Sequence, residues 1–247
     1  MALIGLYDVF AKNWEGQSVW LTSDTHFGDA DLKAGFPNRP SDEDLVKLMN
    51  TQCGKRDVLI HLGDVGNVEY VRQLRAQYKV LVMGNHDAGA TNYKRVVEKR
   101  IFDRDIHPDK AEIRAIMGAE YPGWRISVYE EHDLTCPFDR WVAIADNGLF
   151  DEVYEGPLMV AEKLLFSHER VDVPWAFNVH GHDHKGVKHT GCMNVCLDAN
   201  GYKMINLNQF LKQGHTAKVQ TIHRATIDGA IERKKKRGGK KIGEKNA

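Results

Sequence analysis

Strand and helix patterns alternate three times in the first third of this chain, and this alternation limits the folds that it can adopt. Apolar, β-branched runs at residues 18–23, 57–62 and 79–83 predict strands. Ser41 and Asn67 are suitable N-caps for helices that follow the first two strands. We therefore expect a largely parallel sheet with helices on its faces. In such sheets, ligands bind beyond the carboxyl ends of the strands.

Each predicted strand ends in a polar cluster. The first strand is followed by Asp24 and His26, the second by Asp64, and the third by residues 84–87, Gly-Asn-His-Asp. A fourth cluster at residues 180–184, His-Gly-His-Asp-His, follows an apolar run. The polar groups at strand ends are Asp24, His26, Asp64, Asn85, His86, His168, His182 and His184.

Two carboxylates, one amide and several imidazoles form a mixed nitrogen and oxygen donor set. This set suits Mn, Fe, Zn, Ni or Co. It suits calcium poorly, because calcium prefers oxygen ligands alone, and structural zinc would use the cysteines. One ion cannot use so many ligands, whereas two ions that share a bridging carboxylate can. A pair of such ions is an arrangement found in enzymes that hydrolyse phosphoesters.

The middle of the chain shows weaker patterns. We predict helices at residues 93–102 and 109–117, and strands at 126–129 and 141–144. No catalytic motif is visible in residues 88–146, and we expect them to form a variable, cap-like insertion that covers the site and shapes substrate choice.

Two hairpins are predicted after this insertion. The first joins residues 149–154 to 158–166, and the second joins 194–198 to 204–207.

Composition indicates a soluble globular protein, with 42% hydrophobic and 28% charged residues. We expect no membrane span and no signal peptide. The four cysteines form no C-x-x-C pair, which predicts reduced thiols and a cytoplasmic location. Residues 231–247 hold eight basic and two acidic side chains, a charge of +6 that leaves −6 elsewhere. We expect residues 230–247 to form a basic, disordered tail.

The order of these motifs resembles that of the calcineurin-like metallophosphoesterases. Asp24-x-His26, Gly63-Asp64, residues 84–87, His168 and Gly181-His182-x-His184 follow one another as in that superfamily. The sequence of residues 22–28 and the Arg39-Pro40 pair are most similar to those of small bacterial and phage members of the superfamily. The resemblance covers residues 18–207. It implies two packed mixed β-sheets flanked by helices, within a domain of residues 1–229.

The resemblance also implies roles for individual residues. A metal-bridging hydroxide attacks phosphorus, His86 stabilises or protonates the leaving oxygen, and Asp87 orients the His86 ring. Asn85 and His86 contact the substrate. The implied ligands are Asp24, His26 and His184 for the first ion, Asn85, His168 and His182 for the second, and Asp64 as the bridge.

Other polar residues have two interpretations each. Arg170 contacts phosphate or makes a surface ion pair, and Arg39 contacts phosphate or supports its loop. We expect His61 and His180 to support the ligands rather than to bind metal.

The leading hypothesis is therefore an enzyme with two divalent ions, with Mn as the first candidate, that hydrolyses a phosphomonoester, a phosphodiester or a nucleotide pyrophosphate. The first alternative is a nuclease that uses the basic tail to bind RNA or DNA. The second is a non-catalytic scaffold, although that hypothesis predicts lost ligands and all seven are present.

Overall fold

The computed structural model describes residues 17–102, 109–131, 140–160, 163–217, 219, 229 and 231–233. Most of the predicted basic tail lies outside these residues. The division into one domain and a tail stays a prediction. In the described part of the chain, no helix is long and apolar enough to cross a membrane.

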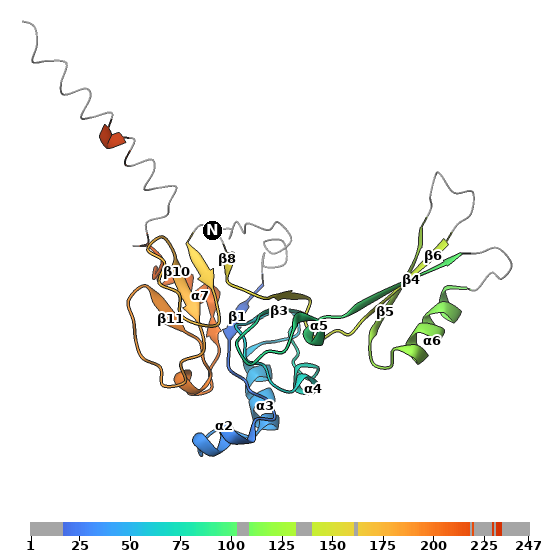
Figure 1. The fold of residues 1–247 in the computed structure, drawn as a ribbon, viewed down its shortest axis with the longest axis horizontal. Helices are drawn as coiled ribbons and strands as arrows, with labels where there is room; N and C mark the ends of the chain where they lie inside the picture. The colour runs from blue at the N-terminus through green and yellow to red at the C-terminus, as the bar shows by residue number, and fades with distance from the viewer. Residues whose placement is uncertain are drawn as a thin grey trace, which may run out of the picture.

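The described residues form three sheets (Figure 1). The five-stranded sheet has the order β12-β1-β2-β3-β7, from β1 (Val19–Thr22), β2 (Val58–His61), β3 (Tyr78–Val82), β7 (Glu152–Tyr154) and β12 (Ile205–Asn206). The four-stranded sheet has the order β11-β10-β9-β8, from β8 (Leu158–Val160), β9 (Leu164–Phe166), β10 (Phe177–His180) and β11 (Cys192–Asn194). The three-stranded sheet has the order β4-β6-β5, from β4 (Val96–Phe102), β5 (Arg125–Glu131) and β6 (Arg140–Asp146).

The first two sheets pack face to face. Their shared core includes Val58 and Ile60 of β2 and Phe166 and Val179 of the other sheet, all essentially inaccessible to solvent. Successive strand residues point to opposite faces, so Leu59 faces outward and contacts helices. Both sheets are mixed, since β12 and β8 run antiparallel to their neighbours. This confirms the predicted fold class.

Short helices flank the five-stranded sheet and fix its loops. The helices are α2 (Ala30–Gly35), α3 (Asp42–Gln52), α4 (Val68–Val71), α5 (Ala90–Tyr93), α7 (Leu207–Lys212) and the 3-10 helix η1 (Asp198–Asn200). The predicted N-caps are confirmed, because the Ser41 side chain accepts from Asp44 N and that of Asn67 accepts from Glu69 N.

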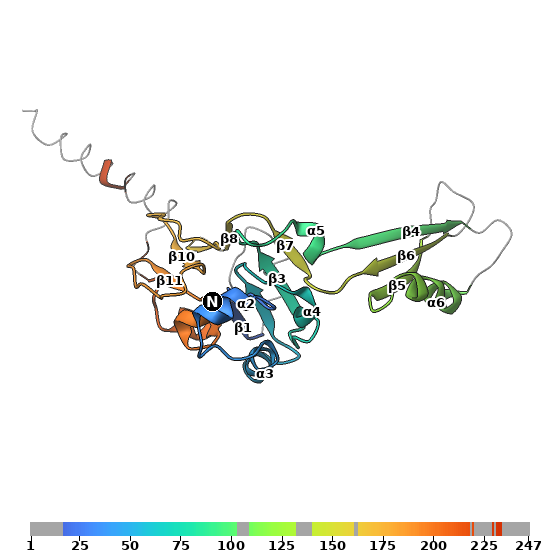
Figure 2. The ribbon, with the colours of Figure 1, turned by 60° about the horizontal axis from the view of Figure 1, so that its bottom comes forward.

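The three-stranded sheet and α6 (Lys110–Glu120) form an arm (residues 96–146) that extends away from the two packed sheets (Figures 1 and 2). The strands predicted at 126–129 and 141–144 and the helix predicted at 109–117 are confirmed. The helix predicted at 93–102 is wrong, because most of this segment is β4, which pairs with β6 along seven residues. Whether the arm contacts a substrate stays a prediction.

Both predicted hairpins are wrong as well. β7 pairs with β3 and not with β8, so residues 149–166 pass from one sheet to the other. β11 and β12 also lie in different sheets, next to β10 and β1. Pairing with distant strands wins over the local turn in both places.

Candidate metal centre

Sharp backbone turns hold the polar clusters at the strand ends. Asp24, His26, Asp64 and His182 have positive φ angles of 58°, 39°, 57° and 66°. Positive φ angles are uncommon for residues other than glycine, and the exceptions are concentrated at functional sites. The loops after β1 and β2 are hydrogen-bonded together, since Asp24 N donates to Gly63 O at 2.9 Å and His26 N donates to Asp64 O at 3.0 Å.

The buried Asp64 carboxylate lies at the centre of the cluster. Its Oδ2 atom is 3.4 Å from His26 Nε2 and 3.2 Å from His168 Nε2. Its Oδ1 atom accepts a hydrogen bond from His86 N at 3.0 Å. Burial acts to raise the pKa of Asp64, but the close His168 and His26 imidazoles outweigh it and hold this pKa well below its usual range. A single carboxylate therefore serves two groups of imidazoles.

On one side of Asp64 lie the ligands predicted for the first ion. His184 Nε2 is 3.7 Å from Asp24 Oδ1, and the His26 and His184 rings are 5.3 Å apart between centroids. The Asp24 carboxylate is fully buried and accepts from His182 N at 3.0 Å, which fixes its direction. Gly181 allows this approach, because a Cβ there would lie 2.6 Å from Asp24 Oδ2.

On the other side lie the ligands predicted for the second ion. His168 Nε2 is 2.9 Å from Asn85 Oδ1 and 3.2 Å from His182 Nδ1. The other ring nitrogen, Nδ1, lies 2.8 Å from the Leu62 carbonyl oxygen. If Nδ1 donates to that carbonyl, Nε2 is left free to bind a metal. The structure thus brings all seven predicted ligands into one connected cluster.

A comparison with known protein families matches residues 18–206, which include the whole cluster, to the calcineurin-like phosphoesterases. The chain belongs to the calcineurin-like phosphoesterase family. The predicted superfamily is therefore confirmed, and with it metal-dependent phosphoesterase chemistry in general. A search of functionally curated proteins found no match. Among solved structures, the protein of unknown function AQ665 from Aquifex aeolicus is similar, with 20% identity, a TM-score of 0.46, and coverage of 80% of this chain and 100% of that one.

The donor atoms of this phosphoesterase fit divalent ions. Three groups of side chains each place their ligand atoms within 4.8 Å of one another: Asp24, His26 and Asp64; Asp64, His168 and His182; and Asp24, His184 and Cys196. His26 Nε2 is buried and has no hydrogen-bond partner among the described residues. A buried polar atom without a partner is costly, and a metal ion would satisfy it.

The structure separates the roles of the neighbours His86 and Asp87. His86 is exposed, and its ring lies 5.4 Å from the His26 ring between centroids. Asp87 was expected to orient that ring, but its carboxylate instead accepts from the backbone N–H groups of Asp64 at 2.9 Å and Gly84 at 2.8 Å, and from the Tyr93 hydroxyl at 2.8 Å. These bonds give Asp87 the task of holding the Asp64 loop in place.

The position of Arg39 does not favour the alternative in which this residue contacts phosphate. The side chain is buried, and its guanidinium donates to the Asp198 carboxylate and to the backbone carbonyls of Asp24 and Thr25. Its donors therefore point into the protein, which corresponds to the loop-supporting alternative.

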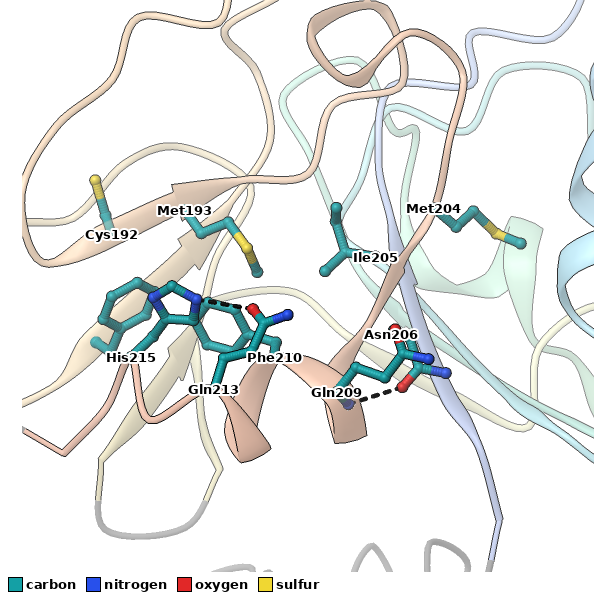
Figure 3. A pocket seen from close by; sticks show the side chains of 10 residues that line it. Cys192, Met193, Met204, Ile205, Asn206, Gln209, Phe210, Gln213 and His215 are labelled. Carbon is teal, nitrogen blue, oxygen red and sulfur yellow. Dashed lines mark hydrogen bonds between the residues drawn. The ribbon is translucent and has the colours of Figure 1, made fainter.

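Arg170 is exposed and lines a pocket of about 500 Å³ together with Cys192 and His215. These two residues also line a neighbouring pocket of about 430 Å³, in which His215 stacks on Phe210 (Figure 3). Among the described residues, none of the seven ligands lines either pocket. The predicted phosphate contact of Arg170 stays a prediction.

Sequence reasoning missed Asp198 and Cys196. Asp198 Oδ2 lies 2.7 Å from His184 Nδ1, and the hydrogen bond between them raises the pKa of His184. Cys196 is buried beside Asp24 and His184. No local pattern marks either residue, because His184 is 14 positions from Asp198 and their contact exists only in the folded chain. His61 supports the ligand loop as expected, with Nε2 2.9 Å from Thr25 Oγ1.

Proposed function

We propose that this protein is a phosphoesterase that uses two divalent ions to hydrolyse a phosphomonoester or a phosphodiester. The observation that carries this proposal is the Asp64 carboxylate, whose Oδ2 atom lies within 3.4 Å of imidazoles from both groups of ligands. Asp24, His26 and His184 would hold the first ion, and Asn85, His168 and His182 the second. Mn is the first candidate on ligand type, and Fe, Zn, Ni and Co suit the same donors.

When bound, such ions polarise a phosphoryl oxygen and lower the pKa of a water molecule to near neutrality. The residues of the chain supply position and protons. Asp64 keeps its charge because His168 and His26 lower its pKa. Asp87 holds the backbone of this loop, and His86 N donates to the Asp64 carboxylate at 3.0 Å, which orients it.

His86 is the candidate proton donor to the leaving oxygen. Its side chain is exposed at the cluster, so a substrate can reach it, while its backbone N–H is held by Asp64. Asn85 is also exposed, and its Oδ1 atom lies 2.9 Å from His168 Nε2. The proposed substrate contacts are therefore Asn85 and His86, with Arg170 as a more distant candidate.

The substrate class stays open between small phosphoesters, including nucleotides, and nucleic acid. The nuclease alternative depends on the basic tail, and deletion of residues 231–247 should weaken RNA or DNA binding and its salt dependence if it is right. A scaffold is disfavoured, because the cluster is complete. The cytoplasmic location also remains a proposal, and it fits the free thiols of Cys53, Cys192 and Cys196.

The experiment is a metal-reconstitution assay with matched substrates. Chelator-treated protein is loaded with Mn, Fe, Zn, Ni or Co, and hydrolysis of p-nitrophenyl phosphate is compared with that of the bis ester. We expect turnover that follows metal occupancy. With an alkyl phosphoester, whose leaving oxygen must be protonated, His86→Asn should lower kcat by about 10²-fold or more, as for loss of a general acid. The loss should be smaller for p-nitrophenyl esters, and metal content should be unchanged. Absence of turnover across a broad phosphoester panel with every metal would refute the proposal.

A further inference from the structure

The two halves of the metal centre are supported in different ways. His168 is held through Nδ1 by a backbone carbonyl, that of Leu62, at 2.8 Å. His184 is held through Nδ1 by a side chain, the Asp198 carboxylate, at 2.7 Å. A carbonyl of a β-sheet loop is fixed by the fold itself, whereas a carboxylate needs its own support.

Arg39 provides that support. Its Nη1 atom pairs with Asp198 Oδ2, and the two side chains are 3% and 1% exposed. Its Nη2 atom donates to the Asp24 carbonyl at 3.1 Å and to that of Thr25. One guanidinium therefore connects Asp198, which orients a ligand, to the backbone of another ligand. These contacts span residues 159 positions apart in the sequence.

Burial of this ion pair is costly, and a well-packed apolar pair would often be as stable. A buried pair of this kind needs a reason other than stability. Here each charge also reaches the ligands on one side of the centre, Asp198 through His184 and Arg39 through the turn of Asp24. Removal of Arg39 would leave the Asp198 carboxylate buried beside His184 without its cation.

We propose that Arg39 and Asp198 are positioning residues of the first metal site, where Asp198 fixes the His184 ring and Arg39 fixes both Asp198 and the Asp24 turn. This inference rests on the proposed two-metal function. The first site depends on the buried pair, and the second site, supported by the Leu62 carbonyl, does not. Loss of either residue should therefore weaken one site and spare the other.

The test measures metal binding by the full-length chain, with equilibrium dialysis of Mn and Zn and metal analysis. Wild-type protein should bind two ions. In Asp198→Asn, which keeps the shape but loses the charge, one site should weaken by about 10–100-fold, as for other residues that orient metal ligands. Arg39→Met should have a similar effect, and Arg39→Lys a smaller one, since lysine cannot bridge three acceptors in the same plane.

Two controls separate positioning from general damage. Arg125→Met removes an exposed arginine that pairs with Asp146 at 3.3 Å, and it should leave both sites unchanged. In a double-mutant cycle on a His184→Ala background, Asp198→Asn should cause no further loss at the first site, because it acts through His184. Thermal melting of metal-free Arg39→Lys checks that the chain folds.

The outcomes are distinct. Equal loss at both sites, or no loss at either site in folded variants, would overturn this inference. If wild-type protein binds two ions and hydrolyses phosphoesters while the variants bind metal normally, only the positioning role fails. If wild-type protein does not bind two ions, the proposed function fails first.

Discussion

The pair of packed sheets and the arm are built on opposite plans. The packed sheets use short, mainly parallel strands that end in loops of strained backbone, and all seven candidate ligands lie there. The arm uses three antiparallel strands of seven residues each, with α6 on one face. Its small core is formed by Ile113, Met117, Val128, Ala143 and Ala145.

The difference shows how structural demands are divided. The site requires polar side chains in unfavourable backbone, and the large core between the two sheets holds them in place. The arm contains none of the candidate ligands. Its strands are paired down to Val96 and Asp146 at its base, and it has a hydrophobic core of its own. One visible link is Arg125 of β5, which pairs with Asp151 outside the arm at 3.1 Å. We expect mutations in the two regions to separate activity from stability.

Asp64→Asn should give the largest effect. The variant keeps the side-chain volume but removes the charge that two groups of imidazoles share. We expect kcat to fall by at least about 10²–10³-fold, because metal assistance contributes several kcal/mol and each 1.36 kcal/mol is tenfold. Steady-state kinetics with metal analysis would measure this. A thermal midpoint far below that of wild-type protein would contradict the separation of activity from folding.

The same glycine-to-alanine change should have opposite results in the two regions. A Cβ at Gly84 would collide with Asp64 and come within 2.8 Å of His168 Nδ1. We expect Gly84→Ala to lower kcat/KM by about 10²-fold, since a shift of about 1 Å at a site can cost that much.

The matched control is Gly118 in α6, where a Cβ meets no atom within 4 Å. Gly118→Ala should raise stability by about 0.5–1 kcal/mol, because alanine loses less backbone entropy in a helix, and should leave kcat/KM unchanged. Denaturant unfolding and kinetics on both variants would check this. Similar effects of the two substitutions on stability and on kcat/KM would contradict the difference proposed between the two regions.

Sequence reasoning succeeded where local pattern and chemistry coincide. β1, β2 and β3 are buried apolar runs, and each leads directly into ligands whose residue types limit the possible chemistry. The predicted ligands come together because parallel strands end at the same edge of a sheet. The assignment of these residues to two ions came from the resemblance to a known family, and not from the local pattern alone.

It failed where distant partners decide. The β4 segment carries charges at Glu98, Lys99 and Arg100 that are compatible with an exposed helix, and only pairing with β6 makes it a strand. The contact between Arg39 and Asp198 has no local signature, since it joins residues that are 159 positions apart in the sequence. The two predicted hairpins are wrong for the same reason.

His61 gives a smaller, pH-dependent effect confined to the packed sheets. Burial lowers its pKa from 6.5 to about 4. The unfolded chain then binds the proton more readily, so stability is present above about pH 6.5 and is lost as pH falls toward 4. The loss is on the order of 3 kcal/mol.

His61→Gln keeps a group near Thr25 Oγ1 but cannot titrate, and it should flatten this dependence in urea unfolding between pH 7 and 4. The exposed His189→Gln is the control and should retain the wild-type slope. An unchanged slope in His61→Gln would show that other groups, such as the ligands, cause the loss at acid pH.

The smallest effect is expected from removing the arm. Residues 97–145 can be replaced by Asn-Gly, a favourable two-residue hairpin turn, because Val96 and Asp146 are already partners across the base. The bond from Asn147 N to Arg95 O, 3.0 Å long, remains and closes the new loop. The ion pairs of exposed Arg125 are lost, and such pairs contribute about 0–1 kcal/mol.

We expect the shortened protein to fold and to hydrolyse bis-p-nitrophenyl phosphate with unchanged kcat/KM, since no predicted ligand lies in the arm. The Tyr93 bond to Asp87 is retained, so the Asp64 loop keeps its support. A loss of about tenfold in kcat/KM is equal to ~1.4 kcal/mol of transition-state stabilisation. Such a loss would mean that the arm shapes the site, which is what the prediction of a cap-like insertion at residues 88–146 states. A loss confined to a larger natural substrate would instead place the arm in substrate choice, because the small ester reports on the metal centre alone.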